Sequence, residues 1–242
     1  MISVQQNQSY GVVELRRYVM RPGRRDTLIG LFEREFVESQ ETCGMVPIGH
    51  YRDLDDPDSF PWFRGFTDMH RRRAALEAFY ERSRAWHDHR EAANATMVDS
   101  DNVLLLRGAR PDSGFDTSGL TRPAGNEPGD DGALVSVSIA MLNEPADERF
   151  VRAFEDLILP TIRTHADRVA YLVTEDCPND FPKLPVRDGE HAFVVAGICR
   201  TEDALHSWQA AIDPQRLPPV LRERTKSSEN LRLMPAARCL FR

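Results

Sequence analysis

The sequence has no apolar stretch long enough to cross a membrane as a helix. Such helices need about 18 or more nearly uninterrupted apolar residues, and no stretch of the 242 residues approaches this length. The first residues, MISVQQNQSYG, also lack the basic segment and the apolar core of a secretory signal. We therefore predict a cytoplasmic protein without a membrane span.

Cysteine is scarce, and its spacing is not that of a metal site. The four cysteines are Cys43, Cys177, Cys199 and Cys239. No C-x-x-C pair occurs among them, which predicts reduced thiols rather than a disulfide framework or a zinc site. His87 and His89 stand two apart on a predicted helix, about 200° around its axis, so they cannot hold one metal together. We expect neither a metal nor a cofactor.

Positive charge is also in short supply. Lysine and arginine number 31 against 38 aspartates and glutamates, which gives a net charge of −7. An extended surface for nucleic-acid phosphates is therefore not expected, and we predict no nucleic-acid partner. The run Arg71-Arg72-Arg73 points in three directions on a helix, so we expect it to form a solvated face.

The short motifs that mark well-known chemistry are missing as well. The sequence contains no H-E-x-x-H, P-loop, G-x-G-x-x-G or G-x-S-x-G motif. No catalytic residue is therefore assigned from a motif.

A glycine- and proline-rich segment divides the chain near its middle. Residues 108–132, GARPDSGFDTSGLTRPAGNEPGDDG, hold six glycines and three prolines among mostly small polar residues. We expect nothing in this segment to bury an apolar face, so it is interpreted as a linker or a long surface loop. It separates a predicted domain of residues 1–107 from a second, divergent domain of residues 133–242.

The two halves have the same predicted order of elements, β-α-β-β-α-β. Hydrophobic periodicity predicts strands at 11–20, 45–52, 60–66 and 103–107 in the first half, and at 134–142, 168–174, 191–198 and 231–241 in the second. Helical spacing lies between the first and second and between the third and fourth strands of each half. Residues 100–105, SDNVLL, also match 228–233, SENLRL, and Gly65-Phe66 matches Gly197-Ile198. We interpret the chain as a tandem repeat.

Three local signals bound the elements of the first half. Pro22-Gly23 predicts a turn after the first strand. Gly44 predicts a left-handed residue just beyond the first helix, and Asp68 predicts an N-cap for the second helix.

The order β-α-β-β-α-β is that of a ferredoxin-like unit, an antiparallel sheet with helices on one face. The open face of such a sheet needs cover, and two sheets can cover each other as a barrel with the helices outside. The predicted fold class is therefore α+β, with tandem ferredoxin-like units whose antiparallel sheets pack as a dimeric α/β-barrel. We expect the barrel to form either between the halves of one chain or between each half and its copy in a homodimer.

Several stretches of the first half resemble one protein family. VVELRRYVMRPGRRDTLIGLFEREF, PWFRGFTDM and RAWHDHREAANATMVDSDNVLLL look like the NIPSNAP proteins of the dimeric α/β-barrel superfamily. The resemblance covers residues 11–107; in the second half it is only architectural, since FVVAGI replaces the WxRGF pattern. It implies a ferredoxin-like barrel and little about chemistry. The wider superfamily includes cofactor-free monooxygenases, haem-degrading enzymes and isomerases, so the fold does not select a function.

The stretch FPWFRGF places an arginine in an otherwise apolar strand. Side chains alternate across a strand, so if Phe63 faces the helices, Trp62 and Arg64 face the barrel. The first and third strands are neighbours in a ferredoxin-like sheet, so Glu14 can pair with Arg64. We predict an inward-facing ligand pocket made of Glu14, Arg16, Tyr18, His50, Trp62 and Arg64.

The second half has small or uncharged residues at the matching positions. Ser136, Ser138 and Ala140 match Glu14, Arg16 and Tyr18, while Val194 and Ala196 match Trp62 and Arg64. Any site is therefore expected in the first half.

Two interpretations of this cluster remain open. In one, the guanidinium groups, the imidazole and the aromatic rings bind a small carboxylate or enolate ligand. In the other, the charges form a salt-bridge network that holds the two sheets in register.

Two functions follow from these interpretations. The first is a NIPSNAP-like protein that binds a small molecule or a protein partner without catalysis. The alternative is a cofactor-free enzyme, a monooxygenase or an isomerase, acting on a small aromatic or keto-acid metabolite in the barrel of the first domain. There His50 or Tyr18 would handle the proton, and Arg16 or Arg64 would stabilise the developing anion.

Overall fold

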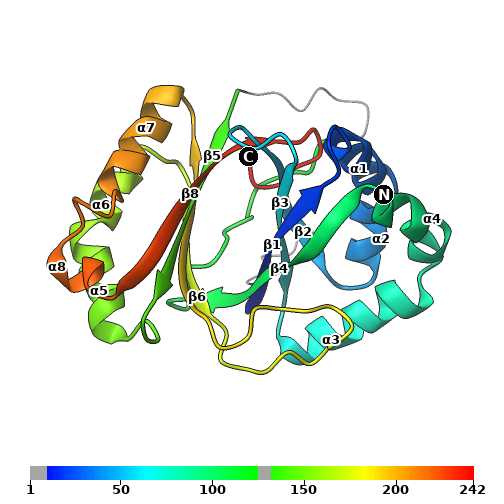
Figure 1. Ribbon diagram of the computed structural model, residues 1–242, viewed down its shortest axis with the longest axis horizontal. Helices are drawn as coiled ribbons and strands as arrows, with labels where there is room; N and C mark the ends of the chain where they lie inside the picture. Colours follow the sequence, from blue (N-terminus) through cyan, green and yellow to red (C-terminus); the bar gives the residue numbers. More distant parts are fainter. Residues whose placement is uncertain (1–9, 125–131) are drawn as a thin grey trace.

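Eight antiparallel β-strands close into one barrel within a single chain, and the helices lie outside it (Figure 1). The computed structural model describes residues 10–124 and 132–242. Residues 1–9, which bear on the absence of a secretory signal, and 125–131 of the expected linker lie outside the described residues. The strand order around the barrel is β1-β3-β2-β8-β5-β7-β6-β4. Of the two expected arrangements, the barrel has the one that forms within one chain.

The elements follow the same order in both halves. The first half contains β1 (Val12–Met20), α1 (Arg25–Leu31), the π-helical turn η1 (Phe32–Phe36), α2 (Val37–Thr42), β2 (Val46–Asp53), β3 (Ser59–Phe66), α3 (Met69–Glu77), the π-helical turn η2 (Ala78–Arg82), α4 (Arg84–Asn94) and β4 (Met97–Gly108). The second half contains β5 (Leu134–Leu142), α5 (Glu148–Leu157), α6 (Leu159–Arg163), β6 (Val169–Thr174), β7 (His191–Cys199), α7 (Glu202–Ala211), α8 (Pro219–Arg222) and β8 (Thr225–Pro235).

Two seams join the halves. At one seam β4 pairs with β6, with Leu106 opposite Thr174. At the other, β2 pairs with β8, with Tyr51 opposite Pro235. Helices α1–α4 cover the outer face of the first sheet and α5–α8 cover that of the second, on opposite sides of the barrel in Figure 1. The barrel therefore has an interior lined by both halves and two separate outer helix layers.

The local signals read from the sequence are confirmed. Gly23 and Gly44 have φ angles of +70° and +94°, which is the left-handed region that glycine tolerates. The side chain of Asp68 accepts a hydrogen bond of 2.7 Å from the backbone N–H of Arg71 and so caps α3. These signals were predictable because each depends on a few neighbouring residues.

The barrel interior is apolar, and the predicted direction of β1 and β3 is wrong. Val13, Leu15 and Phe63 point into the barrel, where they join apolar residues of the second sheet such as Val135 and Leu231. The other faces of the two strands contribute Val12, Trp62 and Phe66 to a second core beneath α1–α4. The alternation itself was correct. Both faces of β3 are buried, however, and alternation alone does not say which face is inside.

A bulge in β2 also changes the predicted position of His50. Pro47 pairs with Arg64 and Gly49 with Phe63, so Ile48 is an extra residue in the ladder. Val46 and Ile48 both face the barrel interior, as residues two apart on a strand do. The extra residue reverses the alternation after Ile48, so His50, opposite Trp62, faces the helices. The prediction that His50 shares a face with Val46 and Ile48 is therefore wrong.

The first part of the expected linker is not a simple surface loop. Phe115 is 3% exposed and lies inside one end of the barrel. Its ring centroid is 4.9 Å from that of Phe63 and 4.9 Å from that of Phe241. The expectation that nothing in residues 108–132 buries an apolar face is thus wrong for Phe115, which closes the barrel end together with the C-terminal segment.

We expect Phe115→Ala to lower the free energy of unfolding by about 3–5 kcal/mol, the usual effect of emptying a buried phenylalanine site. Urea denaturation followed by circular dichroism would measure the loss. Leu157→Ala, on the exposed side of α5, is the control and should change stability by less than about 0.5 kcal/mol. A loss below about 1 kcal/mol for Phe115→Ala would mean that the segment does not close the barrel.

Candidate functional site

A buried carboxylate, that of Glu14, binds three arginines between the first sheet and its helices. Its Oε2 lies 2.8 Å from Nη1 of Arg16 and 2.7 Å from Nε of Arg64. Its Oε1 lies 2.7 Å from Nε of Arg72. The four side chains, called the arginine cluster below, are all at most 1% exposed.

Aromatic residues surround the arginine cluster. Nε of Arg16 donates to the hydroxyl of Tyr18 at 2.9 Å, and Nη1 of Arg64 donates to the hydroxyl of Tyr80 at 3.1 Å. Both guanidinium groups lie near the ring of Trp62, at 5.8 Å and 5.3 Å from its centroid. Cation–π contacts of this kind are strongest where water is excluded.

The prediction of Glu14 opposite Arg64 is confirmed, since the two are direct partners on β1 and β3. Of the six predicted site residues, four lie around Glu14; His50 is opposite Trp62 in the ladder but bonds to Glu33 instead of to this group. Glu14 and these four residues face the helices instead of the barrel interior. Whether they contact a ligand stays a prediction.

Arg72 is the member of the arginine cluster that the sequence reading missed. The run Arg71-Arg72-Arg73 was expected to be solvated, yet Arg72 is fully buried. A signal was present, because Arg72, Leu76 and Phe79 follow the i, i+4, i+7 spacing of one helix face. An arginine on the buried face of a helix needs an acidic partner, and Glu14 supplies it.

The electrostatics of the arginine cluster hold Glu14 ionised. Burial by itself would raise the pKa of Glu14, but the neighbouring Arg64, Arg16 and Arg72 outweigh it and keep the pKa well below its usual range. One further carboxylate, that of Asp180, reaches the group through Nη1 of Arg72 at 2.5 Å. Three positive and two negative charges leave an excess of one positive charge.

His50 occupies a separate position on the same helix-facing side. Its Nε2 lies 2.9 Å from Oε1 of Glu33, and its ring centroid is 5.2 Å from that of Phe32. Its Nδ1 is buried without a hydrogen-bond partner among the described residues. Burial lowers the pKa of His50, and the hydrogen bond to Glu33 offsets this only in part. The lowered pKa favours the neutral form of the imidazole.

An open cavity of about 630 Å³ lies beside the arginine cluster. It is enclosed by Leu104 and Leu105 of β4 and by the segment between β6 and β7, residues 175–190, called the Ω-loop below. Leu105 is the strand neighbour of Glu14. None of the six predicted site residues lines the cavity.

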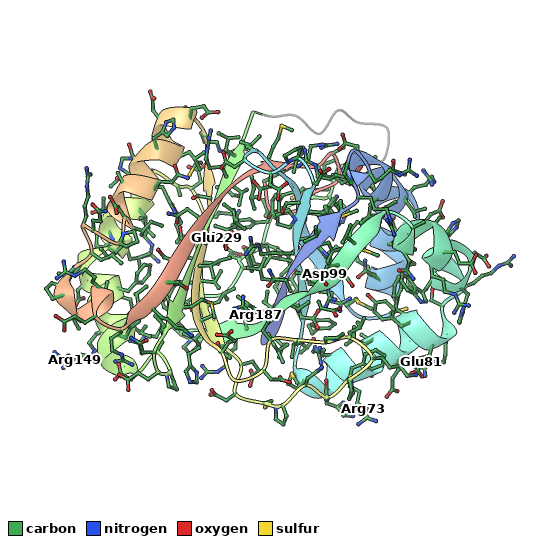
Figure 2. The ribbon with its side chains drawn as sticks, in the orientation of Figure 1. Arg73, Glu81, Asp99, Arg149, Arg187 and Glu229 are labelled. Atoms are coloured by element: carbon green, nitrogen blue, oxygen red, sulfur yellow. The ribbon has the colours of Figure 1, made fainter. Side chains whose placement is uncertain are left out.

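The ends of the Ω-loop are held together on β4. The backbone N–H of Glu175 donates to the carbonyl of Leu105, and that of Arg187 to the carbonyl of Val103, both at 2.9 Å. A segment that leaves a strand and returns beside it has the geometry of an Ω-loop. We call the place where the two ends meet the neck of the Ω-loop. In Figure 2, Arg187 lies there, beside the barrel strands.

The middle of the Ω-loop crosses from the second half of the chain to the helix layer of the first half (Figure 1). Phe181 is 4% exposed and belongs to the core beneath α1–α4, with its ring centroid 6.3 Å from that of Tyr80. Lys183 pairs with Glu81 at 2.6 Å. The loop therefore forms a wall of the cavity and also covers part of the arginine cluster.

The chemistry at the cavity wall is not that of an activated nucleophile. Cys177 lines the cavity and is exposed, but a hydrogen bond with Glu175 raises the pKa of its thiol. A thiol with a raised pKa is a weak nucleophile at neutral pH. Within residues 10–124 and 132–242, no group of three or more His, Cys, Asp or Glu side chains could hold a metal ion, and no helix could cross a membrane.

No protein-family model matches the sequence, and no curated protein matches it. Solved structures do match the fold. A candidate monooxygenase from Fusobacterium nucleatum has a TM-score of 0.61 and 8% identity, with 94% of this chain and 93% of that chain covered. A candidate monooxygenase from Lactobacillus acidophilus has a TM-score of 0.56 and 13% identity over 94% of both chains. An uncharacterised NIPSNAP domain protein from Burkholderia xenovorans covers 48% of this chain and 98% of its own, at 14% identity and a TM-score of 0.36.

These similarities establish the fold and nothing more specific. The neighbours that span almost the whole chain, which include chlorite dismutase structures, are of the dimeric α/β-barrel type. The chain therefore has an α+β fold with a closed antiparallel barrel of that type. Identities of 8% to 13% carry no information about chemistry.

Removing the carboxylate should destabilise the protein more than removing one arginine. Glu14→Gln leaves three guanidinium groups without their buried counter-charge, and we expect a loss of about 3–5 kcal/mol. Arg64→Met leaves Glu14 with Arg16 and Arg72, and we expect about 1–3 kcal/mol. Urea denaturation would measure both losses.

The exposed pair Arg17–Glu229 offers the matched control for Glu14→Gln. Glu229 is 49% exposed, so Glu229→Gln should cost no more than about 1 kcal/mol. Equal losses for Glu14→Gln and Glu229→Gln would contradict the assignment of Glu14 as the buried counter-charge.

His50 should make stability depend on pH. Its folded-state pKa lies below the unfolded value of 6.5, so the unfolded state binds the proton more readily. This contribution to stability is complete above about pH 6.5 and is lost as the pH falls through the folded-state pKa. Denaturation of wild type and His50→Gln between pH 7.5 and 5.5 should show a steeper loss for wild type, limited to about 1.4 kcal/mol per pH unit.

The exposed His87 provides the control for this measurement. His87→Gln should keep the slope of the wild type. The same slope in His50→Gln and in wild type would show that His50 titrates normally in the folded protein.

Proposed function

We propose that the chain is a NIPSNAP-like protein that binds a small molecule, without catalysis, in the cavity beneath the Ω-loop. The observation that carries the proposal is the cavity itself. Its volume of about 630 Å³ falls within the range of about 300–1,000 Å³ that is typical of small-molecule sites. The sequence resemblance over residues 11–107 supports the family assignment.

The lining of the cavity suits a ligand with an apolar body. Apolar surface comes from Leu105, Pro182, Pro185 and Val186, and charged groups come from Glu175, Asp176, Arg187 and Asp188. Small-molecule sites commonly combine a mainly apolar wall with a few polar groups that orient the ligand.

We propose no catalysis because the titratable groups near the cavity are paired with one another through hydrogen bonds and ion pairs. The Cys177 thiol has a raised pKa, and the arginine cluster is closed around Glu14. The alternative enzyme needed His50 or Tyr18 beside Arg16 or Arg64 inside the barrel of the first domain. Tyr18 and Arg16 do lie side by side, but they face the helices and do not line the cavity, and His50 pairs with Glu33, so we prefer the non-catalytic function.

We further propose that the barrel is built from two ferredoxin-like units, with domains of residues 1–107 and 133–242. The support is that β1 lies between β3 and β4 just as β5 lies between β7 and β8. A cytoplasmic location and a homodimer remain expectations from the sequence.

A bulky residue in the cavity should abolish binding. A thermal-shift screen of small carboxylates and neutral aromatic compounds should find binders that raise the Tm of the wild type by about 3–6 °C at ten times Kd. Val186→Trp fills the cavity and should lose this shift. Val98→Trp adds the same side chain at an exposed position of β4 and should keep it.

Two results would contradict the proposal. One is that every binder shifts Val186→Trp as it shifts the wild type, which would put binding elsewhere. The other is that mass spectrometry finds a binder converted into a product by the protein, which would show catalysis.

A further inference from the structure

The Ω-loop places an acidic residue of the second half on an arginine of the first half. Oδ1 of Asp180 lies 2.5 Å from Nη1 of Arg72, and Oδ1 of Asn179 lies 3.2 Å from the same nitrogen. We propose that Asp180 acts as a displaceable latch, and that the outer edge of Arg72 is the binding site for the anionic group of the ligand. This inference rests on the proposed function, because it assumes that the cavity holds a ligand.

The hydrogen bonding of Arg72 is incomplete in the latched state. Its Nε donates to Glu14 and its Nη1 is shared by Asn179 and Asp180, but its Nη2 has no partner among the described residues. The side chain of Arg72 is completely buried, so this donor is shielded from bulk solvent. A guanidinium group binds a carboxylate or phosphate best through two parallel hydrogen bonds. Asp180 accepts a hydrogen bond from Nη1 through one oxygen only, so the parallel hydrogen bond from Nη2 is not formed.

The positive charge of the arginine cluster favours an anion at the outer edge of Arg72. With Asp180 included, three arginines face two carboxylates, which leaves one positive charge buried without a counter-charge. Buried charges are costly unless they are paired. A ligand carboxylate that takes the place of Asp180 would keep this charge balance and would also bind Nη2 of Arg72, which Asp180 leaves without a partner among the described residues.

The latch also lies at the boundary between Arg72 and the cavity. Asn179 lines the cavity and touches Arg72, and the adjacent Asp180 is 23% exposed. A small displacement of this part of the Ω-loop would therefore connect the cavity with the arginine. The exposed pair Lys183–Glu81 contributes little to stability, whereas the neighbouring Phe181 is anchored in the core beneath α1–α4, so the displacement concerns Asn179 and Asp180 only.

The neighbouring surfaces define the class of ligand. Tyr80 and Phe181 stand beside the latch, and Leu105 and Pro182 form apolar walls. The apolar walls suit a molecule with an apolar or aromatic body. Because Glu175, Asp176 and Asp188 on the rest of the lining repel an anion, its one carboxylate or phosphate group is assigned to Arg72. Benzoate is the probe for the carboxylate, benzamide is its neutral counterpart, and inorganic phosphate tests for binding of an anion alone.

The test compares two neutralised acids of the Ω-loop. Asp180→Asn removes the charge that competes for Arg72, so it should raise the affinity for benzoate by about tenfold in calorimetric titration, because more of the protein is then ready to bind. Asp176→Asn neutralises an exposed acid that lines the cavity but does not contact Arg72, so it should raise the affinity by less than about twofold. Benzamide should bind both variants as it binds the wild type.

A second readout follows the loop itself. Trypsin should cleave after Lys183 faster in Asp180→Asn than in the wild type, because the latch is weakened. The Asp176→Asn variant should be cleaved at the wild-type rate. Equal cleavage of all three proteins would overturn the latch.

A third variant tests the arginine. Arg72→Met should lose the preference for benzoate over benzamide. Glu14 keeps two arginines in this variant, and circular dichroism would verify that it folds. If it does not fold, the Asp180→Asn comparison decides by itself.

The outcomes separate this inference from the proposed function. Equal binding of benzoate and benzamide by wild type, Asp180→Asn and Asp176→Asn, lost in Val186→Trp, would overturn the latch and leave the cavity as a ligand site. No binding of benzoate or benzamide to any variant, with binding of phosphate to Asp180→Asn, would show an adventitious ion only and overturn the inference.

Discussion

The pairing of one buried carboxylate with three arginines organises the first half of the molecule. Glu14 lies on β1, and its partners come from β1, β3 and α3, so this one side chain fixes a strand pair and a helix relative to each other. Buried ion pairs often add little net stability, because desolvation offsets attraction. Their main effect is on specificity, since moving any partner would leave a charge buried and unpaired. The Ω-loop extends this constraint to the second half through Asp180.

The second half packs its helices against its sheet without such buried charges. Glu14 faces Arg64 across β1 and β3, whereas Ser136 faces Gly197 across β5 and β7. The fourth residue after the N-cap is Arg72 in α3 and Leu205 in α7, and both are buried. The structural counterpart of Arg64 is therefore Gly197, one residue after the predicted Ala196. Ala196 faces the barrel interior.

The packing at Gly197 explains how the second half fills this space. A β-carbon at Gly197 would come within 2.5 Å of the ring of Trp208, so the indole occupies the volume that an arginine would need. Nε1 of Trp208 donates to the hydroxyl of Ser138 at 3.1 Å. Because one arrangement of strands and helices is stable with apolar packing, the fold does not require an arginine cluster. That contrast is a reason to look for a role of the cluster beyond stability.

The sequence by itself determined the order of the elements, the turn at Gly23, the cap at Asp68 and the pairing of Glu14 with Arg64. These follow from local backbone chemistry and from the neighbour relation of the first and third strands. Only the tertiary structure decided which face of β3 lies inside the barrel, because both faces are buried and alternation fits either direction. It also decided where Arg72, His50 and Phe115 lie, since these depend on a helix face, a strand bulge and a barrel end formed by distant parts of the chain.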